Sequence, residues 1–264
     1  MKISVCGKGG SGKSTTVTLL AGEAQSRGYK VLVVDSDVSN AGLYRILGFS
    51  QPPVPLMEIV GGKKKIISTL REPAASDLAP KAMVLTQDRI AIEDIPAENV
   101  VERDNLKLVS VGKILQALEG CACPFGVLSR EFLKRLDEGD NGLVIVDMEA
   151  GVEHFGRGVE ESVDAVLMVV EPSFESLELA GRIDSLATGT GIKNVSAILN
   201  KVPSDDIASK LEAELGKRSI RVIGCIHHDP ELLDSSLEGC ALHTGRAADE
   251  IRGVLDSVLS QASG

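Results

Sequence analysis

Short apolar runs rich in valine and isoleucine alternate with longer amphipathic stretches along the chain. The runs are almost continuously apolar, which is typical of strands buried on both faces, as in parallel sheets covered by helices. Residues 11–28 follow the first run with a helical pattern that ends at Gly28. The alternation predicts an α/β fold with a doubly wound, mostly parallel sheet flanked by helices. The predicted strands are residues 2–7, 30–35, 106–111, 142–147, 163–170, 195–200 and 220–226.

One stretch breaks the alternation. Residues 50–105 contain several prolines and mixed charges without a regular period. The 264 residues suit one large domain or two small ones. Since no linker, repeat or low-complexity tract divides them, we expect a single domain, residues 1–264, with an internal insertion at about 50–105.

The composition narrows the range of partners. The formal net charge is -10 and aromatic residues make up 3% of the chain, so neither an overall positive field nor base-stacking side chains favour nucleic acid. No segment is long and apolar enough to span a bilayer, and no signal peptide is evident. We expect a cytoplasmic protein that binds neither nucleic acid nor membrane. In that compartment its five cysteines are expected as thiols or metal ligands rather than disulfides.

Residues 7–14 read GKGGSGKS and match the phosphate-loop pattern of Gly, four residues, then Gly-Lys-Ser. A predicted strand precedes the loop and a predicted helix follows it, as the pattern requires. Glycines let backbone N–H groups surround phosphate oxygens at the positive end of the helix. Lys13 is expected to reach the outer phosphates and the Ser14 hydroxyl to coordinate Mg²⁺. The expected nucleotide-binding residues of the loop are Gly9, Gly10, Ser11, Gly12, Lys13, Ser14 and Thr15.

Carboxylates follow two of the predicted strands. Asp35 and Asp37 come at the end of the second strand in VVDSDVSN, where a carboxylate can face the metal and the attacking water. The run LVIVDMEAG brings Asp147 to another strand end, where a second carboxylate on the Mg²⁺ side is needed. Gly151 gives the following loop freedom to respond to the γ-phosphate.

Lys8, directly after the first glycine, is not required by the general loop pattern. It resembles the deviant phosphate loop of the family that includes the Min and Par ATPases, the arsenite-pump ATPase and the nitrogenase iron protein. The resemblance implies that Lys8 reaches across a nucleotide-sandwich homodimer to the partner's phosphates. It also implies that Asp37 orients or activates the attacking water and that Asp35 supports Mg²⁺.

The same resemblance extends to the predicted strand at residues 195–200. The family reads adenine with an asparagine side chain, and AILNK places Asn200 and Lys201 at the matching point. We therefore expect an ATPase with Lys8, Lys13 and Asp37 as catalytic residues. The sequence predicts ATP binding better than fast turnover, so hydrolysis is expected to be slow and to control opening of the dimer.

Cys121 and Cys123 lie one residue apart in EGCACPFG. Two thiolates do not complete the four-ligand site of Zn²⁺ or a similar ion, but two copies of the loop across a two-fold axis would. Tetrahedral geometry would suit Zn²⁺ and square-planar geometry Ni²⁺. Idle thiols and a redox dithiol remain alternatives, although the usual redox spacing is Cys-x-x-Cys. The remaining cysteines (Cys6, Cys225, Cys240) and the pair His227–His228 are expected to be structural or surface residues.

A narrower resemblance combines the deviant loop with EGCACPFGVLSREFL and VDMEAGVEHFGRG. It is to the CooC-type maturation ATPases, the nickel-insertion proteins of carbon monoxide dehydrogenase, with relatives that serve acetyl-CoA synthase. It implies an ATPase that binds Ni²⁺ (or Zn²⁺) through Cys121 and Cys123 in a homodimer and passes it to such a client. His154 and Arg157 would transmit the nucleotide signal or simply be surface residues.

Two rival functions stay open: a positioning ATPase of the Min or Par kind, and a dimeric iron–sulfur reductase. The acidic charge and the poorly basic C-terminal stretch DEIRGVLDSVLSQASG count against the first. The absence of a cysteine from residues 147–158 counts against the second, because the nitrogenase iron protein takes one cysteine from that region.

Overall fold

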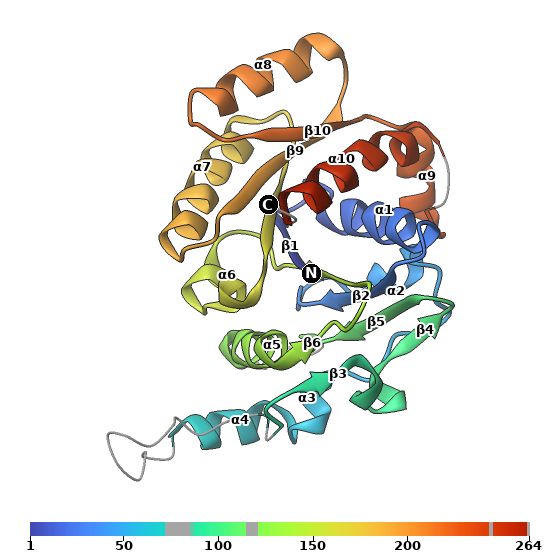
Figure 1. Ribbon diagram of the computed structural model, residues 1–264, viewed down its shortest axis with the longest axis vertical. Coiled ribbons are helices and arrows are strands. Elements are labelled where there is room, and N and C mark those ends of the chain that lie inside the picture. The colour runs from blue at the N-terminus through green and yellow to red at the C-terminus, as the bar shows by residue number, and fades with distance from the viewer. Residues whose placement is uncertain (72–84, 86, 115–120, 243–244, 263–264) are drawn as a thin grey trace.

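The computed structural model describes residues 1–71, 85, 87–114, 121–242 and 245–262. Its central sheet has eight strands in the order β10-β9-β8-β1-β7-β2-β5-β4 (Figure 1). Seven run parallel, and the short edge strand β4 pairs antiparallel with β5. The strands of this sheet are β1 (Lys2–Gly7), β2 (Lys30–Asp35), β4 (Val101–Arg103), β5 (Leu106–Ser110), β7 (Gly142–Asp147), β8 (Ala165–Val170), β9 (Asn194–Val202) and β10 (Val222–His227).

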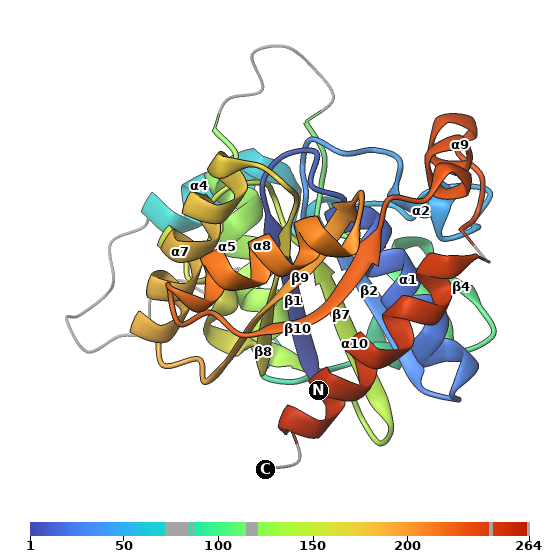
Figure 2. The same ribbon diagram turned by 90° about the horizontal axis from the view of Figure 1, so that it is seen from above.

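The strands form because their apolar side chains are buried on both faces. In β2, Val31 and Val33 enter one core cluster while Leu32 and Val34 enter the other. Helices cover each face, with α1 and α10 on one side and α5 and α7 on the other (Figure 2). The predicted doubly wound, mostly parallel α/β fold is confirmed. The helices are α1 (Lys13–Ser26), α2 (Leu43–Ile46), α3 (Leu56–Ile59), α4 (Gly62–Arg71), α5 (Cys123–Arg135), α6 (Glu153–Gly156), α7 (Phe174–Gly189), α8 (Asp205–Gly216), α9 (Pro230–Glu238) and α10 (Arg246–Ala262).

The chain between β2 and β4 contains α2, α3, α4 and the short strand β3 (Ile90–Ala91), which pairs with β6 (Leu136–Asp137). Two 3₁₀ turns, η1 (Ile92–Asp94) and η2 (Ala97–Asn99), lead from β3 to β4, and a third, η3 (Val159–Ser162), follows α6. Lys63 of α4 lies with its Nζ 4.4 Å from the centre of the Phe125 ring in α5. This contact joins the segment to the helix that carries Cys123.

None of the described helices has the length and apolar character needed to cross a membrane. The parallel strands instead place the functional residues at one edge of the sheet, because their carboxyl ends meet there. β1, β2, β7 and β9 all lead into loops at this edge, which is the usual ligand-binding edge of doubly wound sheets.

Candidate functional site

The loop between β1 and α1 turns through three glycines with left-handed φ angles, 146° at Gly7, 80° at Gly10 and 95° at Gly12. A Cβ at Gly7 would lie 2.6 Å from the carbonyl oxygen of Val169, so the path requires glycine there. Gly12 is the N-cap of α1, and no described side chain caps this helix or brings an acid into its first turn. The N–H groups at the start of α1 are therefore available to an anion.

Two buried carboxylates lie beside this loop. Asp35 and Asp147 end the neighbouring strands β2 and β7 and pair in register. The Ser14 hydroxyl donates to Asp147 Oδ2 at 2.6 Å and accepts from Asn40 Nδ2 at 2.9 Å. Each carboxylate also has a buried Oδ1 without a hydrogen-bond partner in the described part of the chain. Partnerless carboxylate oxygens next to a hydroxyl fit a hard cation such as Mg²⁺.

The pKa values of both carboxyl groups are raised. Burial raises the pKa of Asp147 to about 7, and the nearby charge of Asp35 adds to the effect. Burial also raises the pKa of Asp35 to about 6, against the opposing influence of Lys113, whose Nζ lies 2.7 Å from Asp35 Oδ2. A cation bound between the two carboxylates would favour their charged forms.

A cavity of about 560 Å³ opens next to the loop, a volume typical of small-molecule sites. Asp37 lines it, two residues beyond Asp35, and its Oδ1 accepts bonds from the backbone and hydroxyl of Ser39 at 2.9 and 2.6 Å. The predicted residues that line the cavity are Gly9, Gly10, Gly12, Lys13, Ser14, Thr15, Asp37, Asn200 and Lys201. The structure thus brings most of the predicted nucleotide site together around one cavity.

Asn200 and Lys201 of β9 are bonded directly to the phosphate loop. Asn200 Nδ2 donates to the Ser11 carbonyl at 2.7 Å, and Lys201 Nζ donates to the Gly10 carbonyl at 2.6 Å. Lys201 has a φ of 57°, a left-handed conformation that a lysine adopts only where its surroundings impose it. These bonds position the end of β9 against the cavity.

One part of the cavity wall was not predicted. It comprises His227, His228, Asp229, Leu232 and Leu233, from the end of β10 and the start of α9. No motif marks these residues, and the prediction that both histidines are only structural or surface residues missed their place beside the nucleotide site. A signal was nevertheless present, because the segment follows a predicted strand, and strand ends form the ligand edge.

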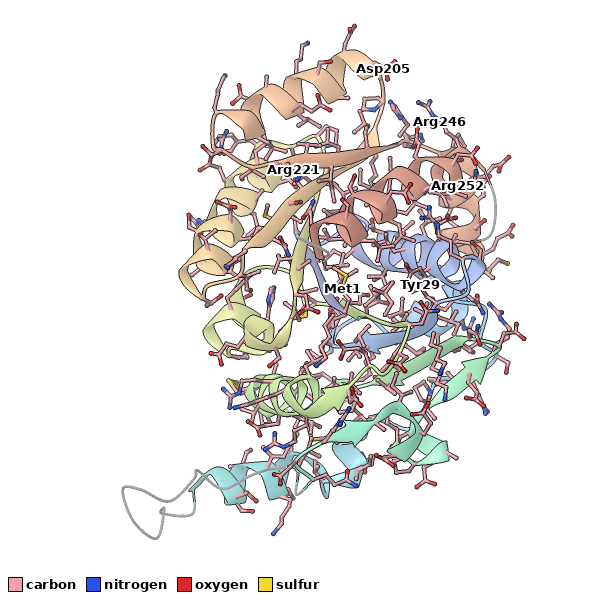
Figure 3. The ribbon with its side chains drawn as sticks, viewed as in Figure 1. Met1, Tyr29, Asp205, Arg221, Arg246 and Arg252 are labelled. Carbon is pink, nitrogen blue, oxygen red and sulfur yellow. A yellow bond between two sulfur atoms is a disulfide. The ribbon has the colours of Figure 1, made fainter. Side chains whose placement is uncertain are left out.

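His227 is held by charged neighbours from two helices, α8 and α10. Its Nδ1 lies 2.7 Å from Glu250 Oε1 and its Nε2 3.0 Å from Asp205 Oδ1. Arg246 also bonds to Glu250, at 2.6 Å. Figure 3 labels Asp205 at the start of α8 and Arg246 at the start of α10. This network fixes the cavity wall and engages both ring nitrogens of His227.

Lys8 points to Glu171, directly after β8, rather than into the cavity. Its Nζ lies 2.9 Å from Glu171 Oε1, and this bond raises the pKa of Lys8. The Lys8 side chain is 37% exposed, and Phe174, three residues after Glu171, is 70% exposed. The phosphate loop therefore lies next to an open face with an exposed aromatic ring.

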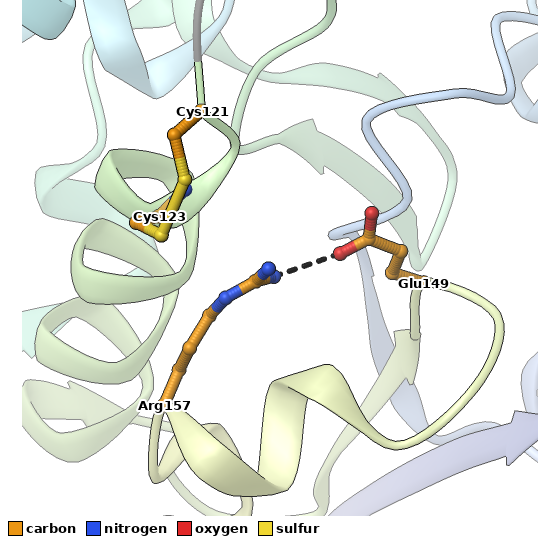
Figure 4. Close-up of a disulfide and its surroundings, with 4 residues drawn as sticks. All are labelled: Cys121, Cys123, Glu149 and Arg157. Atoms are coloured by element: carbon orange, nitrogen blue, oxygen red, sulfur yellow. Dashed lines mark hydrogen bonds and ion pairs between the residues drawn. A yellow bond between two sulfur atoms is a disulfide. The ribbon is translucent and has the colours of Figure 1, made fainter.

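Cys121 and Cys123 are exposed where α5 begins, and a disulfide bond joins them (Figure 4). For this pair, the expectation of thiols or metal ligands rather than a disulfide is wrong in this structure. The start of the helix brings the two Cα atoms to 5.4 Å, within the range of disulfides, and the backbone N–H of Cys123 donates to the Cys121 sulfur at 3.2 Å. The same closeness lets the reduced pair bind one ion together.

No group of three or more histidine, cysteine or acidic side chains in the described ranges could hold a metal ion. A metal bound by Cys121 and Cys123 would need further ligands from beyond the described residues of this chain. Arg157, predicted from the sequence, lies next to the pair and bonds to Glu149 at 2.8 Å (Figure 4). His154 is buried, with Nε2 3.1 Å from the Gly151 carbonyl oxygen, so it is not a surface residue.

The other cysteines differ from the pair. Cys6 is buried in β1, Cys225 lies in β10, and Cys240 is exposed after α9. Burial raises the pKa of the Cys225 thiol to about 11, which keeps it protonated at neutral pH. Cys6 is enclosed in the core, whereas Cys240 provides an accessible single thiol for comparison.

The fold and this site define a P-loop nucleotide-binding protein with a doubly wound sheet. Residues 3–241 match the model of the CobQ/CobB/MinD/ParA nucleotide binding domain. The chain belongs to this family, and it is an ATPase. The predicted relation to the Min and Par ATPases is confirmed.

Individual relatives narrow the comparison. An uncharacterized ATP-binding protein of Methanocaldococcus jannaschii is 42% identical over 256 residues, 97% of this chain and 98% of the relative. The carbon monoxide dehydrogenase accessory protein CooC of Rhodospirillum rubrum is 36% identical over 204 residues, 77% of this chain and 75% of the relative. The fold is similar to that of MinD in the MinC:MinD complex of Aquifex aeolicus, with a TM-score of 0.69 and 19% identity over 98% of this chain and 95% of that chain.

Proposed function

We propose that the protein is a homodimeric, ATP-dependent metallochaperone whose cargo is nickel. It binds Ni²⁺ through Cys121 and Cys123 and delivers it to a nickel enzyme of the carbon monoxide dehydrogenase or acetyl-CoA synthase type. The observation that carries the proposal is the exposed pair of neighbouring sulfur ligands at the start of α5, in a chain whose described residues offer no complete metal site. The 36% identity to the CooC protein supports the choice of client.

The geometry supports the following roles at the nucleotide. Lys13 binds the outer phosphates together with the N–H groups at the start of α1. Ser14, Asp35 and Asp147 form the Mg²⁺ side, and bound Mg²⁺ would neutralise phosphate charge. Asp37, which lines the cavity, orients the attacking water.

Asn200 reads adenine, and Lys201 holds the end of β9 to the loop. The bond from Asn200 to the Ser11 carbonyl and the bond from Lys201 to the Gly10 carbonyl support this division of roles, because both residues lie on the wall of the same cavity. A purine between β9 and the β10–α9 segment would complete the nucleotide contacts.

The dimer forms through the open face around the phosphate loop. A two-fold interface uses the same patch on both copies. With the start of α5 at the axis, the two cysteine pairs would supply four thiolates. Lys8 would leave Glu171 and reach the partner's phosphates. Phe174, Leu233 and Leu237, which are 70%, 52% and 78% exposed, provide apolar surface for this contact.

ATP closes the dimer and assembles the four-thiolate site. Hydrolysis removes the γ-phosphate that Lys8 of the other copy contacts, so the dimer opens and each chain is left with two ligands. The metal is then bound weakly enough to pass to the client. Nucleotide state and metal affinity are linked in this way.

Nickel titration of matched cysteine variants tests the proposal. Under reducing conditions, the double variant Cys121→Ser/Cys123→Ser should bind Ni²⁺ about 100-fold more weakly or worse, since even groups that only orient metal ligands contribute about 10- to 100-fold. The control Cys240→Ser, which removes an exposed cysteine outside the pair, should bind as the unmodified protein does. ATP binding should be retained in both variants. Unchanged nickel affinity in the double variant would overturn the proposal.

A positioning ATPase is the second candidate, because the family model itself includes MinD and ParA. Such a protein would be recruited to a membrane or to DNA. Helix α10 carries Arg246 and Arg252 against Asp249, Glu250 and Asp256, which disfavours anionic lipid. ATP-dependent cosedimentation with anionic vesicles or binding to DNA would favour this candidate over the metallochaperone.

A further inference from the structure

Lys113, which precedes the cysteine pair in the sequence, is bonded to the loop after β2. Lys113, three residues after β5, is buried to all but 13% of its side chain and forms an ion pair with Asp35 at 2.7 Å. The same amino group donates to the backbone carbonyls of Asp37 and Asn40. One ammonium group therefore binds the loop that carries Asp35 and Asp37 at three points.

Helix α5, which carries Cys123, is bonded to the same loop. Ser129 of α5 is 2% exposed, and its Oγ lies 2.6 Å from the Oγ of Ser36, between the two aspartates. Gly112 packs so closely on the Phe125 ring that a Cβ there would come within 2.6 Å of Cδ1. Gly112 and Phe125, which lie on either side of the cysteines in the sequence, thus pack on each other, and Lys113 and Ser129 contact one loop of the nucleotide site.

The charge of Lys113 makes this attachment sensitive to Mg²⁺ and nucleotide. Lys113 binds one oxygen of Asp35, while the other oxygen has no partner among the described residues and belongs to the proposed Mg²⁺ side. A divalent cation beside Asp35 would repel the ammonium group and weaken its attraction to the carboxylate, and the effect is large because the pair is buried. Movement of this loop would then change the position of Lys113 and of α5.

We propose that Lys113 and Ser129 are positioning residues that transmit Mg²⁺-nucleotide occupancy to the Cys121–Cys123 pair. The inference rests on the proposed function, since it names the contacts by which ATP changes metal affinity. Coupling between two sites needs an element that both sites contact. Helix α5 is such an element, because it begins at Cys123 and its Ser129 contacts the loop after β2. Neither Lys113 nor Ser129 lines the nucleotide cavity.

The test compares the ratio of Ni²⁺ dissociation constants measured with and without a non-hydrolysable Mg²⁺-ATP analogue. In the unmodified protein we expect this ratio to differ from one by about five-fold or more, the usual lower range of allosteric coupling. Lys113→Met and Ser129→Ala should each bring the ratio toward one. Lys107→Met is the matched control, because Lys107 lies on β5 and pairs with Glu102 in β4, and its ratio should stay unchanged. Melting temperatures identify any variant that does not fold. If Lys113→Met does not fold, the result for Ser129→Ala, which removes only one oxygen atom, decides the test.

A second readout does not use nickel. In a Cys240→Ser background, the alkylation rate of reduced Cys121 and Cys123 should change when the Mg²⁺-ATP analogue binds, and this change should disappear in Lys113→Met and Ser129→Ala. If both variants keep the full nucleotide response in both assays, the inference is overturned. If the unmodified protein binds no nickel but its thiol reactivity responds through Lys113, the metallochaperone proposal fails and the coupling stands.

Discussion

The phosphate loop (residues 7–14) and the cysteine loop, by which we mean Cys121 and Cys123 at the start of α5, differ in how many of the groups needed for binding one chain supplies. The phosphate loop has its glycine turns, helix N-terminus, carboxylates and cavity wall in place. The cysteine loop has two exposed sulfurs and no further metal ligand among the described side chains. The difference teaches that one chain can bind the nucleotide, whereas a four-thiolate metal site depends on a second copy. In the proposed function, ATP-driven association is the step that joins the two.

Oxidation of Cys121 and Cys123 should have the largest effect, and it should weaken nickel binding at the cysteine pair with little change at the nucleotide site. A disulfide between Cys121 and Cys123 removes both thiolates, so we expect the oxidised protein to bind Ni²⁺ about 100-fold more weakly or worse, while ATP affinity changes less than about two-fold. Isothermal titration before and after treatment with dithiothreitol measures both. Equal nickel affinity in the two redox states would contradict the comparison.

The variant Lys13→Ala should have the reverse effect: it should weaken ATP binding and leave nickel binding intact. It removes the ammonium group expected at the outer phosphates, and losing one partner of a buried charge pair costs about 2–5 kcal/mol, equivalent to about 30-fold or more in ATP affinity. Nickel binding to the cysteine pair without nucleotide should persist. Lys217→Ala, at an exposed lysine of the surface, is the control. A variant that bound ATP normally would refute the assignment of the loop.

A pH series should distinguish the two regions more finely. Because the pKa of Asp147 is raised from 3.8 to about 7, the folded protein without Mg²⁺ binds more protons than the unfolded chain between these values. Its stability is therefore greatest below about pH 4 as far as this group is concerned, and it decreases as the pH rises to 7. Mg²⁺-ATP affinity should instead increase about tenfold from pH 6 to pH 8, as the carboxylate ionises.

Asp147→Asn is the variant that checks this series. It should flatten both pH dependences, which thermal melts and nucleotide titrations would measure across the same range. If the pH dependence of Mg²⁺-ATP binding in Asp147→Asn matched that of the unmodified protein, Asp147 would not be the titrating group.

The smallest expected effect concerns the link between the regions. Glu171→Gln frees Lys8 from a partly exposed ion pair, and such pairs contribute little. We expect ATP-dependent dimerisation to strengthen by a few-fold at most, measured by sedimentation at several concentrations. Weaker dimerisation would mean that Glu171 helps the closed state rather than holding Lys8 in the open one.

The sequence predicts some parts of this molecule well for physical reasons. The seven parallel strands were recognisable because continuous apolar runs such as GLVIVD are buried on both faces, and GKGGSGKS encodes its own turn through glycine. β4 was missed because Val101, Glu102 and Arg103 form a short edge strand with two charges. Lys113 and the wall from His227 to Asp229 were missed because tertiary contacts alone make them part of the site.

The cysteine pair shows the limit of such reasoning most clearly. The spacing of Cys121 and Cys123 indicated a shared function but did not predict the disulfide, which depends on how the start of α5 brings the two Cα atoms to 5.4 Å. Whether two sulfurs form a disulfide or bind a metal is a matter of redox state and of the second copy, and neither is encoded in the spacing.

The most direct test of the central claim is the number of nickel ions bound per chain, measured together with molecular mass. Reduced protein would be titrated with Ni²⁺ with and without ATP while light scattering follows the mass. We predict one Ni²⁺ per two chains and a dimer stabilised by ATP, because each chain supplies two thiolates. A dimer that forms with ATP but takes up no nickel, or a monomer that binds one ion by itself, would contradict the account.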